Sequence, residues 1–245
     1  MKLNGENWNS YYTDNIMMWL SVDPMSDERP WISPYNYCQW NPIGRVDTWG
    51  MLDDEYEVNR KGEITKLNDN DHYDANGNKV DVIYNSDKSN SIQVSKNFSG
   101  SKKSHKNVLG SDNEPHSFDS YEVTGDDKAK EIFEFMADNT DVEWSQTKVG
   151  TNKSQKNFIT TSHEKTKEVG GGWLLNQGYT IRGHNHSHPN NYSTSDSDKD
   201  WAKLVHNKFP KAELYILHKG VYYGYDQHGV LPQYINNDIN DIIVR

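Results

Sequence analysis

Alternating strand and helix patterns in the C-terminal half restrict the fold more strongly than any other feature of the sequence. Apolar residues recur at helical spacing in 128–138, and extended patterns follow at 141–149 and 156–163. A further extended segment at 179–184 precedes a helical pattern that starts after Ser195. Because a helix must bury its apolar stripe against another element, this alternation favours helices packed on a sheet. We therefore predict an α/β (α+β) domain with a mixed sheet flanked by helices.

Short end signals indicate where the two helices begin. Thr124 and Asp127 have the spacing of a capping box, in which each side chain bonds the backbone N–H of the other residue. Ser195 and Asp198 repeat that spacing before the second helix. The segment 213–226 carries two extended runs on either side of a glycine and predicts a hairpin. The sequence thus predicts two capped helices and a closing hairpin.

Composition excludes several classes of protein. The chain has 26 Lys and Arg against 36 Asp and Glu, a net charge of −10, which disfavours wrapping around phosphate backbones. No apolar run approaches the length of about eighteen residues that a membrane span requires. The first residues lack an apolar segment after Lys2, so we expect no secretory signal peptide. Cys38 is the only cysteine, which excludes a disulfide framework and a CxxC zinc site.

Composition also changes along the chain. Hydrophobic residues make up only 33% of the sequence, so the core cannot use all of it. Residues 1–52 are rich in Trp, Tyr and Pro and predict an irregular segment of turns and short extended pieces. Within 53–85, turn signals at Gly62 and Gly77 predict two β-hairpins.

The following stretch, 86–110, is rich in Ser, Asn and Lys and predicts a polar linker or long loop, because it has little to bury. The zones divide the chain into three expected parts. These are an irregular segment at 1–52, a hairpin-rich spacer with a polar linker at 53–110, and a folded domain at 111–245. The last part is expected to hold the functional site.

The motif with the clearest chemistry is a pair of histidines followed by a carboxylate. His186 and His188 stand at i and i+2 on an extended segment, so their rings point the same way and can reach one metal ion. Asp198, in the first turn of the next predicted helix, supplies a third ligand. Catalytic zinc commonly has three protein ligands and leaves one position for water. The spacing therefore predicts a Zn²⁺ site with an open position.

Other interpretations of these residues stay open. His184 extends the motif to HxHxH, which is also typical of an adventitious metal-binding surface, and the SxxD motif can be a helix cap alone. His184, Asn185 and His186 also have the order of an HNH-like ββα-metal nuclease, although Pro189 and the negative net charge argue against it. We expect His184 to face solvent or to contact a metal ligand.

HxHP followed by SxxD resembles the JAMM (MPN/JAB) metalloprotease family. That family combines these motifs with a Glu on an upstream strand, and Glu143 in the sequence TDVEW is the matching residue here. The resemblance implies a JAMM/cytidine-deaminase-like fold in which His186, His188 and Asp198 bind zinc. It also implies that Glu143 is the general base for the attacking water, and that Ser195 stabilises the tetrahedral intermediate.

The spacing departs from that family in one respect. Six residues separate His188 from Ser195, where the family usually has seven. Ser197 with Asp200 is the competing register, with eight residues in between. We prefer Asp198 because the helical pattern then begins at the expected place, and Asp200 remains the alternative ligand.

A second resemblance covers residues 19–50. This stretch is similar to the C-terminal end of the Rhs (YD-repeat) core, which in its family precedes a variable toxin domain. Pro42 to Met51 is similar to the family's PxxxxDPxGL junction, where the core cuts itself free from its toxin, with Thr48 in place of the Pro and Met51 in place of the Leu. JAB-like metalloproteases are among the domains found behind such cores, so the two resemblances support each other.

Together the resemblances imply a zinc-dependent peptidase or isopeptidase that is the toxin domain of an Rhs-type secreted effector in bacterial competition. The expected partners are a protein or peptide substrate, a cognate immunity protein and the parent Rhs core, with neither nucleic acid nor a membrane span. Such an effector is expected in the cytoplasm of the producer before export and of the target after delivery. The alternatives are a metal-dependent nuclease toxin and a non-catalytic metal-binding or interaction module.

Overall fold

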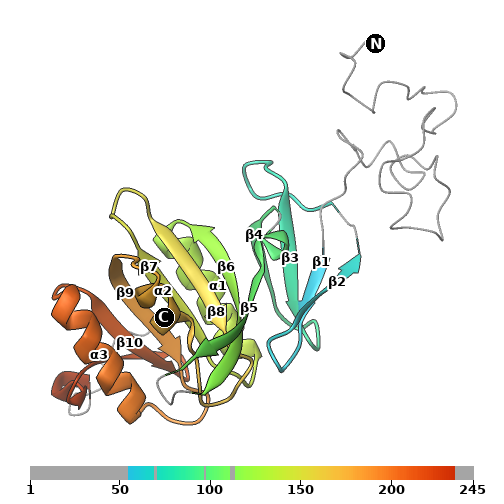
Figure 1. The fold of residues 1–245 in the computed structure, drawn as a ribbon. Coiled ribbons are helices and arrows are strands. Elements are labelled where there is room, and N and C mark those ends of the chain that lie inside the picture. The colour runs from blue at the N-terminus through green and yellow to red at the C-terminus, as the bar shows by residue number, and fades with distance from the viewer. Residues whose placement is uncertain (1–54, 69–70, 97, 111–113, 235–245) are drawn as a thin grey trace, which may run out of the picture.

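The computed structural model describes residues 55–68, 71–96, 98–110 and 114–234, which form two mixed sheets and three α-helices (Figure 1). The α/β class predicted from the sequence is confirmed. The segment predicted to be irregular at 1–52, with its resemblance to the Rhs core, lies outside the described residues. Within the described part, no helix is long and apolar enough to cross a membrane.

A four-stranded sheet comes first in the chain, in the order β2–β1–β3–β4. Its strands are β1 (Glu55–Val58), β2 (Ile64–Asn68), β3 (Val80–Asn85) and β4 (Ser91–Ser95). β1 and β2 form the hairpin predicted around Gly62. The second predicted hairpin forms only as a turn at Gly77. An antiparallel bridge joins Tyr73 and Lys79, and the Val80 N–H donates to the His72 carbonyl at 3.1 Å, but the described residues there form no strand before β3. β3 pairs instead with β1 in parallel and with β4 in antiparallel orientation.

The prediction of a linker over 86–110 is also wrong. This stretch contains β4, a 3-10 helix at Ser99–Ser101 and strand β5 at Lys103–Leu109. Val94 of β4 is buried in the core, whereas β5 is an edge strand with mostly exposed side chains. An edge strand needs few apolar residues and often carries lysines, so its sequence resembles that of a loop.

An eight-stranded sheet carries the rest of the fold, in the order β12–β11–β10–β9–β7–β8–β6–β5. After β5 its strands are β6 (Pro115–Thr124), β7 (Trp144–Val149), β8 (Lys156–Thr161), β9 (Ile181–Ser187), β10 (Glu213–His218), β11 (Val221–Asp226) and β12 (Gly229–Val230). β9 and β10 pair in parallel and the other strand pairs are antiparallel, as a mixed sheet requires. β10 and β11 form the hairpin predicted at 213–226.

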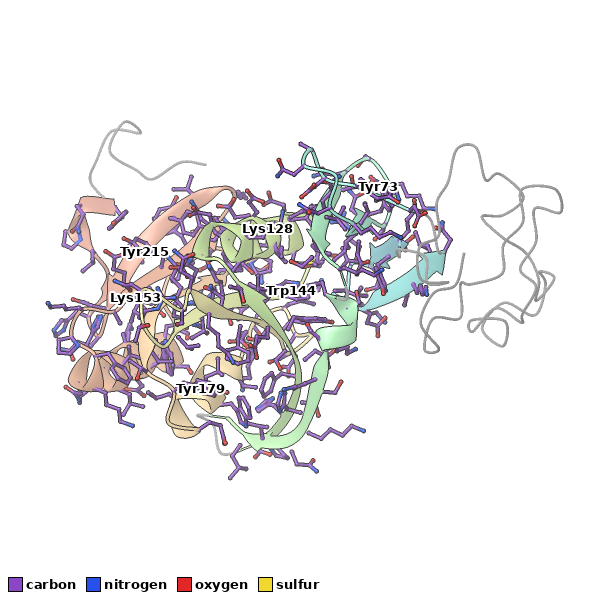
Figure 2. The ribbon with its side chains drawn as sticks, turned by 90° about the horizontal axis from the view of Figure 1, so that it is seen from above. Tyr73, Lys128, Trp144, Lys153, Tyr179 and Tyr215 are labelled. Carbon is purple, nitrogen blue, oxygen red and sulfur yellow. The ribbon has the colours of Figure 1, made fainter. Side chains whose placement is uncertain are left out.

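Helices cover both faces of the large sheet. They are α1 (Asp126–Asn139), α2 (Gly170–Asn176) and α3 (Asp196–Lys208), and a 3-10 turn at Pro232–Tyr234 follows β12. α1 buries Phe133 in a core that it shares with the four-stranded sheet. Trp144 of β7, which is labelled in Figure 2, belongs to the same core. α2 and α3 pack on a second core that includes Ile216 of β10. The next residue, Leu217, belongs to the first core, so the two helical layers lie on opposite faces.

The start of α1 differs from the prediction. β6 continues through Thr124, which pairs with Lys156 of β8. Gly125, with a φ of 96°, occupies the N-cap position, and no side chain caps the helix. The capping box predicted for Thr124 and Asp127 is therefore wrong. Thr124 belongs to β6 and lies one residue before the N-cap position, which Gly125 occupies.

Candidate metal centre

The candidate site lies at the end of β9, on the sheet face covered by α2 and α3. Strand alternation places His184 and His186 on this face, where the ring of His184 packs edge-on against Trp201 of α3. His188 follows β9 directly, and its backbone N–H donates to the carbonyl of Leu217 in β10 at 2.9 Å. The sheet therefore fixes the backbone from which the histidine rings extend.

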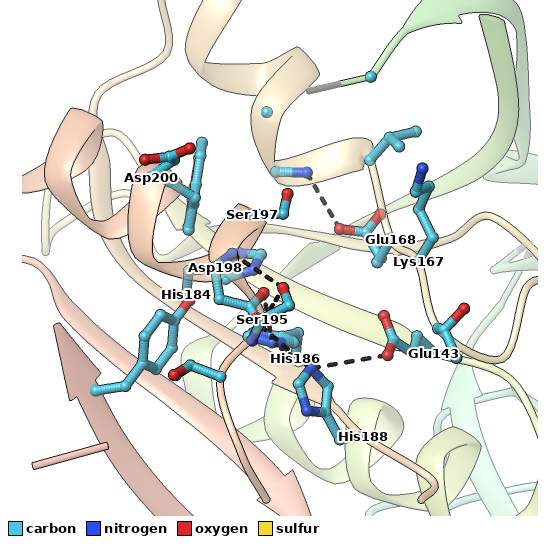
Figure 3. A pocket seen from close by; sticks show the side chains of 18 of the residues that line it. Glu143, Lys167, Glu168, His184, His186, His188, Ser195, Ser197, Asp198 and Asp200 are labelled. Atoms are coloured by element: carbon cyan, nitrogen blue, oxygen red, sulfur yellow. Dashed lines mark hydrogen bonds and ion pairs between the residues drawn. The ribbon is translucent and has the colours of Figure 1, made fainter. Parts of the chain in front are cut away.

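Three side chains converge in front of this strand end (Figure 3). The Nε2 atoms of His186 and His188 are 3.0 Å apart. Asp198 places Oδ1 3.3 Å from His186 Nε2 and Oδ2 3.6 Å from His188 Nε2. Two ligands on a tetrahedral zinc ion lie roughly 3.4 Å from each other, given zinc–nitrogen and zinc–oxygen distances of about 2.1 Å. This donor set therefore fits zinc in both chemistry and spacing.

The surroundings favour the protonation states that bind a metal. Burial, assisted by the neighbouring His186, lowers the pKa of His188 to about 4, so this imidazole is neutral at pH 7. Burial alone would raise the pKa of Asp198, but its interactions with the two histidines lower that pKa below its usual range. Zinc binds neutral imidazole and ionised carboxylate, and the shifts of His188 and Asp198 favour these forms.

The carboxylate of Asp198 also caps helix α3. Ser195 is the N-cap residue, and its Oγ accepts the Asp198 N–H at 3.2 Å. In return, the N–H and the hydroxyl of Ser195 donate to Asp198 Oδ2 at 2.7 and 2.8 Å. The capping box predicted for this helix is confirmed. It orients the carboxylate so that Oδ1 faces His186.

Glu143 lies beside the three converging residues without joining them (Figure 3). It precedes β7 instead of lying within the strand, and its Oε1 is 3.7 Å from His188 Nε2. The side chain is almost fully buried. Burial raises the pKa of Glu143 to about 9, and repulsion from Asp198 acts in the same direction. A cation held between the ligands would lower that pKa again, because it favours the carboxylate form.

A cavity of about 500 Å³ opens in front of these residues. Several elements contribute its apolar and aromatic lining. This lining includes Leu109 of β5, Trp173 and Leu175 of α2, Trp201 of α3 and Tyr225 of β11. Glu168 adds a carboxylate to the wall, and its Oε1 accepts the Thr160 hydroxyl and the Gly170 N–H, both at 2.6 Å. The volume lies within the range of pockets that hold a small ligand, or a short piece of a larger one.

His184 does not face solvent, so that part of the expectation is wrong. It is 5% exposed, and its ring lies 5.5 Å from the ring of His186. Burial lowers the pKa of His184 to about 3, and its Nδ1 is 2.9 Å from Thr147 Oγ1. Asn185 points to the opposite face, where it donates to Gln146. The three residues of the HNH-like motif therefore do not meet at one site.

Asp200, the alternative ligand, lies elsewhere on α3. Its side chain is exposed and lines the cavity, but it is not part of the group that could hold a metal ion. Ser197 of the same register is also exposed. The geometry thus favours Asp198 as the third ligand.

Other side chains shape the site but did not stand out in the sequence. Ser187, between the two histidines, points to the α1 face, and its Oγ accepts the Trp144 N–H at 3.0 Å. The two-residue period of a strand could have placed Ser187 there. Tyr225 of β11 is 2% exposed and lies edge-on to His186, with ring centroids 5.5 Å apart. No local signal identifies Tyr225, because only strand pairing brings it to the site.

Residues 121–204 match the family model described as JAB-like toxin 1. The match runs from within β6 to within α3 and includes all five candidate site residues. It supports a JAB-like toxin domain in this part of the chain. No curated protein and no solved structure matches the sequence.

Proposed function

We propose that this chain carries a zinc-dependent peptidase or isopeptidase, which acts as the C-terminal toxin domain of an Rhs-type polymorphic toxin. One observation carries the proposal. His186, His188 and Asp198 converge so that they could hold one metal ion, with a buried glutamate beside them, inside a segment that matches a JAB-like toxin family. Two imidazoles and one carboxylate leave an open position on zinc, as catalytic sites require.

The chain's own residues supply the remaining parts of a hydrolytic mechanism. Zinc held by His186, His188 and Asp198 would act as a Lewis acid toward the scissile carbonyl and make water nucleophilic at neutral pH. Glu143 Oε1 takes a proton from the attacking water while the oxygen of that water forms a bond to the carbonyl carbon. The same carboxyl returns the proton to the leaving amine when the C–N bond breaks. Glu143 is therefore the general base and then the general acid.

Ser195 is proposed to donate a hydrogen bond to the developing oxyanion. In the structure its hydroxyl proton points to Asp198 Oδ2, so the O–H must turn toward the substrate for this role. Its oxygen can continue to accept the Asp198 N–H during that rotation, because a hydroxyl has two lone pairs. The cap and the catalytic role are therefore compatible.

Substitution of Ser195 separates the two roles. Ser195→Ala removes both and should lower kcat/KM by about 10²- to 10³-fold and the free energy of unfolding by about 1 kcal/mol. Ser195→Gly also lacks the hydroxyl but is tolerated at an N-cap, so it should lower kcat/KM similarly while lowering the free energy of unfolding by only a few tenths of a kcal/mol. Steady-state kinetics and urea denaturation measure the two effects. A Ser195→Ala variant with reduced stability and normal kcat/KM would limit Ser195 to the cap.

The remaining parts of the proposal concern partners and location. A toxin of this kind requires a target, which we propose is a protein or peptide, and an immunity protein that protects the producer. We also propose that the parent Rhs core delivers the domain from the producer's cytoplasm to that of the target cell. The net charge of −10 supports a protein substrate more than a nucleic acid.

Hydrolysis by the purified chain tests the proposed reaction class. With zinc present, we expect cleavage of a peptide library or of a synthetic isopeptide, detected by mass spectrometry, and no cleavage of double-stranded DNA. A chelator should stop the reaction and added zinc should restore it. Metal-dependent DNA cleavage without peptide hydrolysis would instead support the nuclease alternative. Zinc binding without either activity would support the non-catalytic module.

A further inference from the structure

The turn between β1 and β2, residues 59–63, lies directly on the segment that carries Glu143. The carbonyl of Arg60 accepts the N–H of Asp141 at 2.8 Å. Gly62 lies so close to this segment that a Cβ atom on it would be 2.9 Å from Val142 Cγ2 and 3.2 Å from Trp144 Cζ2. Val142 and Trp144 are the two neighbours of Glu143 in the chain, and both are buried.

His163 makes a second connection between the 59–63 turn and the large sheet. Its Nδ1–H donates to the Lys61 carbonyl at 2.9 Å, and its Nε2 lies 2.9 Å from Asp119 Oδ2. Lys102 Nζ is also 2.8 Å from this carboxylate. The hydrogen bond to Asp119 raises the pKa of His163, which favours an imidazolium that donates from both nitrogens. The 59–63 turn is thus held by the His163 side chain, which is itself bound to Asp119 of β6.

The backbone of Glu143 itself is held from the other side. Its N–H donates to the carbonyl of Glu164 at 2.8 Å, and its carbonyl accepts the hydroxyl of Thr161 at 2.8 Å. Glu143 precedes β7, so the ladder of strand hydrogen bonds does not include it. The position of its side chain therefore depends on these two bonds and on the packing of its neighbours against the 59–63 turn.

We propose that the 59–63 turn is a positioning element for Glu143, and that Gly62 is the residue that permits its close approach. The inference rests on the proposed function of Glu143 as the base. The four-stranded sheet lies upstream of the segment matched by the toxin family. Under this proposal the sheet contributes to turnover but not to metal binding. Among the described residues, no hydrogen bond or ion pair joins the 59–63 turn to His186 or His188, so we expect the ligands to keep their geometry when the turn moves.

Two glycines of the four-stranded sheet region offer a matched test. Gly62 and Gly77 have nearly equal φ angles, +78° and +79°, so an alanine is strained at either position to a similar degree. They differ in their surroundings, because a Cβ on Gly77 would have nothing within 4 Å. In Gly62→Ala either the turn or Val142 must move to relieve the clash, whereas the added methyl group of Gly77→Ala meets open space.

In the full chain loaded with zinc, we expect Gly62→Ala to lower kcat at least tenfold, with KM within about threefold of wild type. A displacement of about 1 Å at a catalytic group is sufficient for such a loss. Zinc content should stay at the wild-type value. Gly77→Ala should match wild type in kcat, KM and zinc content. Amide hydrogen exchange at Asp141 and Glu143 should accelerate in Gly62→Ala and not in Gly77→Ala.

Equal kcat values for the two variants would overturn the proposal, as would loss of zinc from Gly62→Ala. If the wild type shows no hydrolysis that depends on Glu143, the proposed function fails. Hydrogen exchange then tests the positioning role by itself, and unchanged exchange in Gly62→Ala would overturn that role. If Gly62→Ala does not fold, His163→Gln replaces it. The control is then His72→Gln, because His72 lies between β2 and β3 and pairs with Glu55 of β1. Reduced kcat in His163→Gln alone would support the proposal, and equal kcat would overturn it.

Discussion

Glu143→Gln is expected to lose nearly all peptide hydrolysis and toxicity while the protein keeps its zinc. Glutamine preserves the shape and hydrogen-bonding reach of the side chain but cannot accept the proton of the attacking water. General-base catalysis commonly contributes 10²- to 10⁴-fold, or about 3–5 kcal/mol of the barrier. Zinc should remain because Glu143 is not part of the converging ligand group. Hydrolysis rates, growth after expression in bacteria and metal analysis measure the three outcomes.

The control for this variant is the same substitution at an exposed position. Glu131 on α1 is 61% exposed and pairs with Lys128 one turn earlier, so Glu131→Gln should leave hydrolysis and toxicity unchanged. The buried site also tolerates a neutral amide, because burial already disfavours the charged form of Glu143. Wild-type toxicity in a folded Glu143→Gln variant would show that hydrolysis by this mechanism is not what the protein does. The nuclease or the non-catalytic module would then be favoured.

His188→Ala is expected to abolish both metal binding and activity. The wild-type chain should contain about one zinc per molecule, and the variant should contain very little. A ligand that binds only the folded state stabilises it by about 4 kcal/mol at a concentration a thousandfold above Kd. A chelator should therefore lower the Tm of the wild type and leave that of His188→Ala almost unchanged. An equal chelator effect on both proteins would place the metal elsewhere.

Two aspartates on the same helix provide the internal control for that experiment. The carboxylate oxygens of Asp198 lie 3.3 Å from His186 Nε2 and 3.6 Å from His188 Nε2, whereas the side chain of Asp200 is exposed. We expect Asp198→Ala to deplete zinc and Asp200→Ala to retain it. The reverse result would assign the third ligand to Asp200 and would support the longer spacing between the HxHP and SxxD motifs.

The convergence of the site residues was predictable because local rules determine most of it. Strand alternation orients His186, and the capping box places Asp198 in the first turn of α3. Both features arise within a few residues of the motif itself. The histidines and the carboxylate therefore converge as their local sequence predicted, and Asp198 takes part both in the cap and in the converging group.

The errors concern features that depend on distant parts of the chain. The polar segment β5 forms a strand only because it pairs with the edge of β6. Likewise, β3 pairs along its length with β1 and β4 and not with the segment that precedes it. The cavity wall has the same origin, since Tyr225 reaches His186 through the pairing of β9, β10 and β11. No pattern of local hydrophobicity records such pairings, because each depends on the tertiary fold.

The core around α1 has a consequence for how a toxin of this kind can be inherited. Tyr56, Val58 and Ile83 of the first sheet are buried together with Phe133 and Trp144 of the family-matched region. A recombination event that joined new upstream sequence at residue 111 would leave the apolar surface around these residues open to water, which favours aggregation. We therefore expect the first sheet to be inherited together with the candidate metal site.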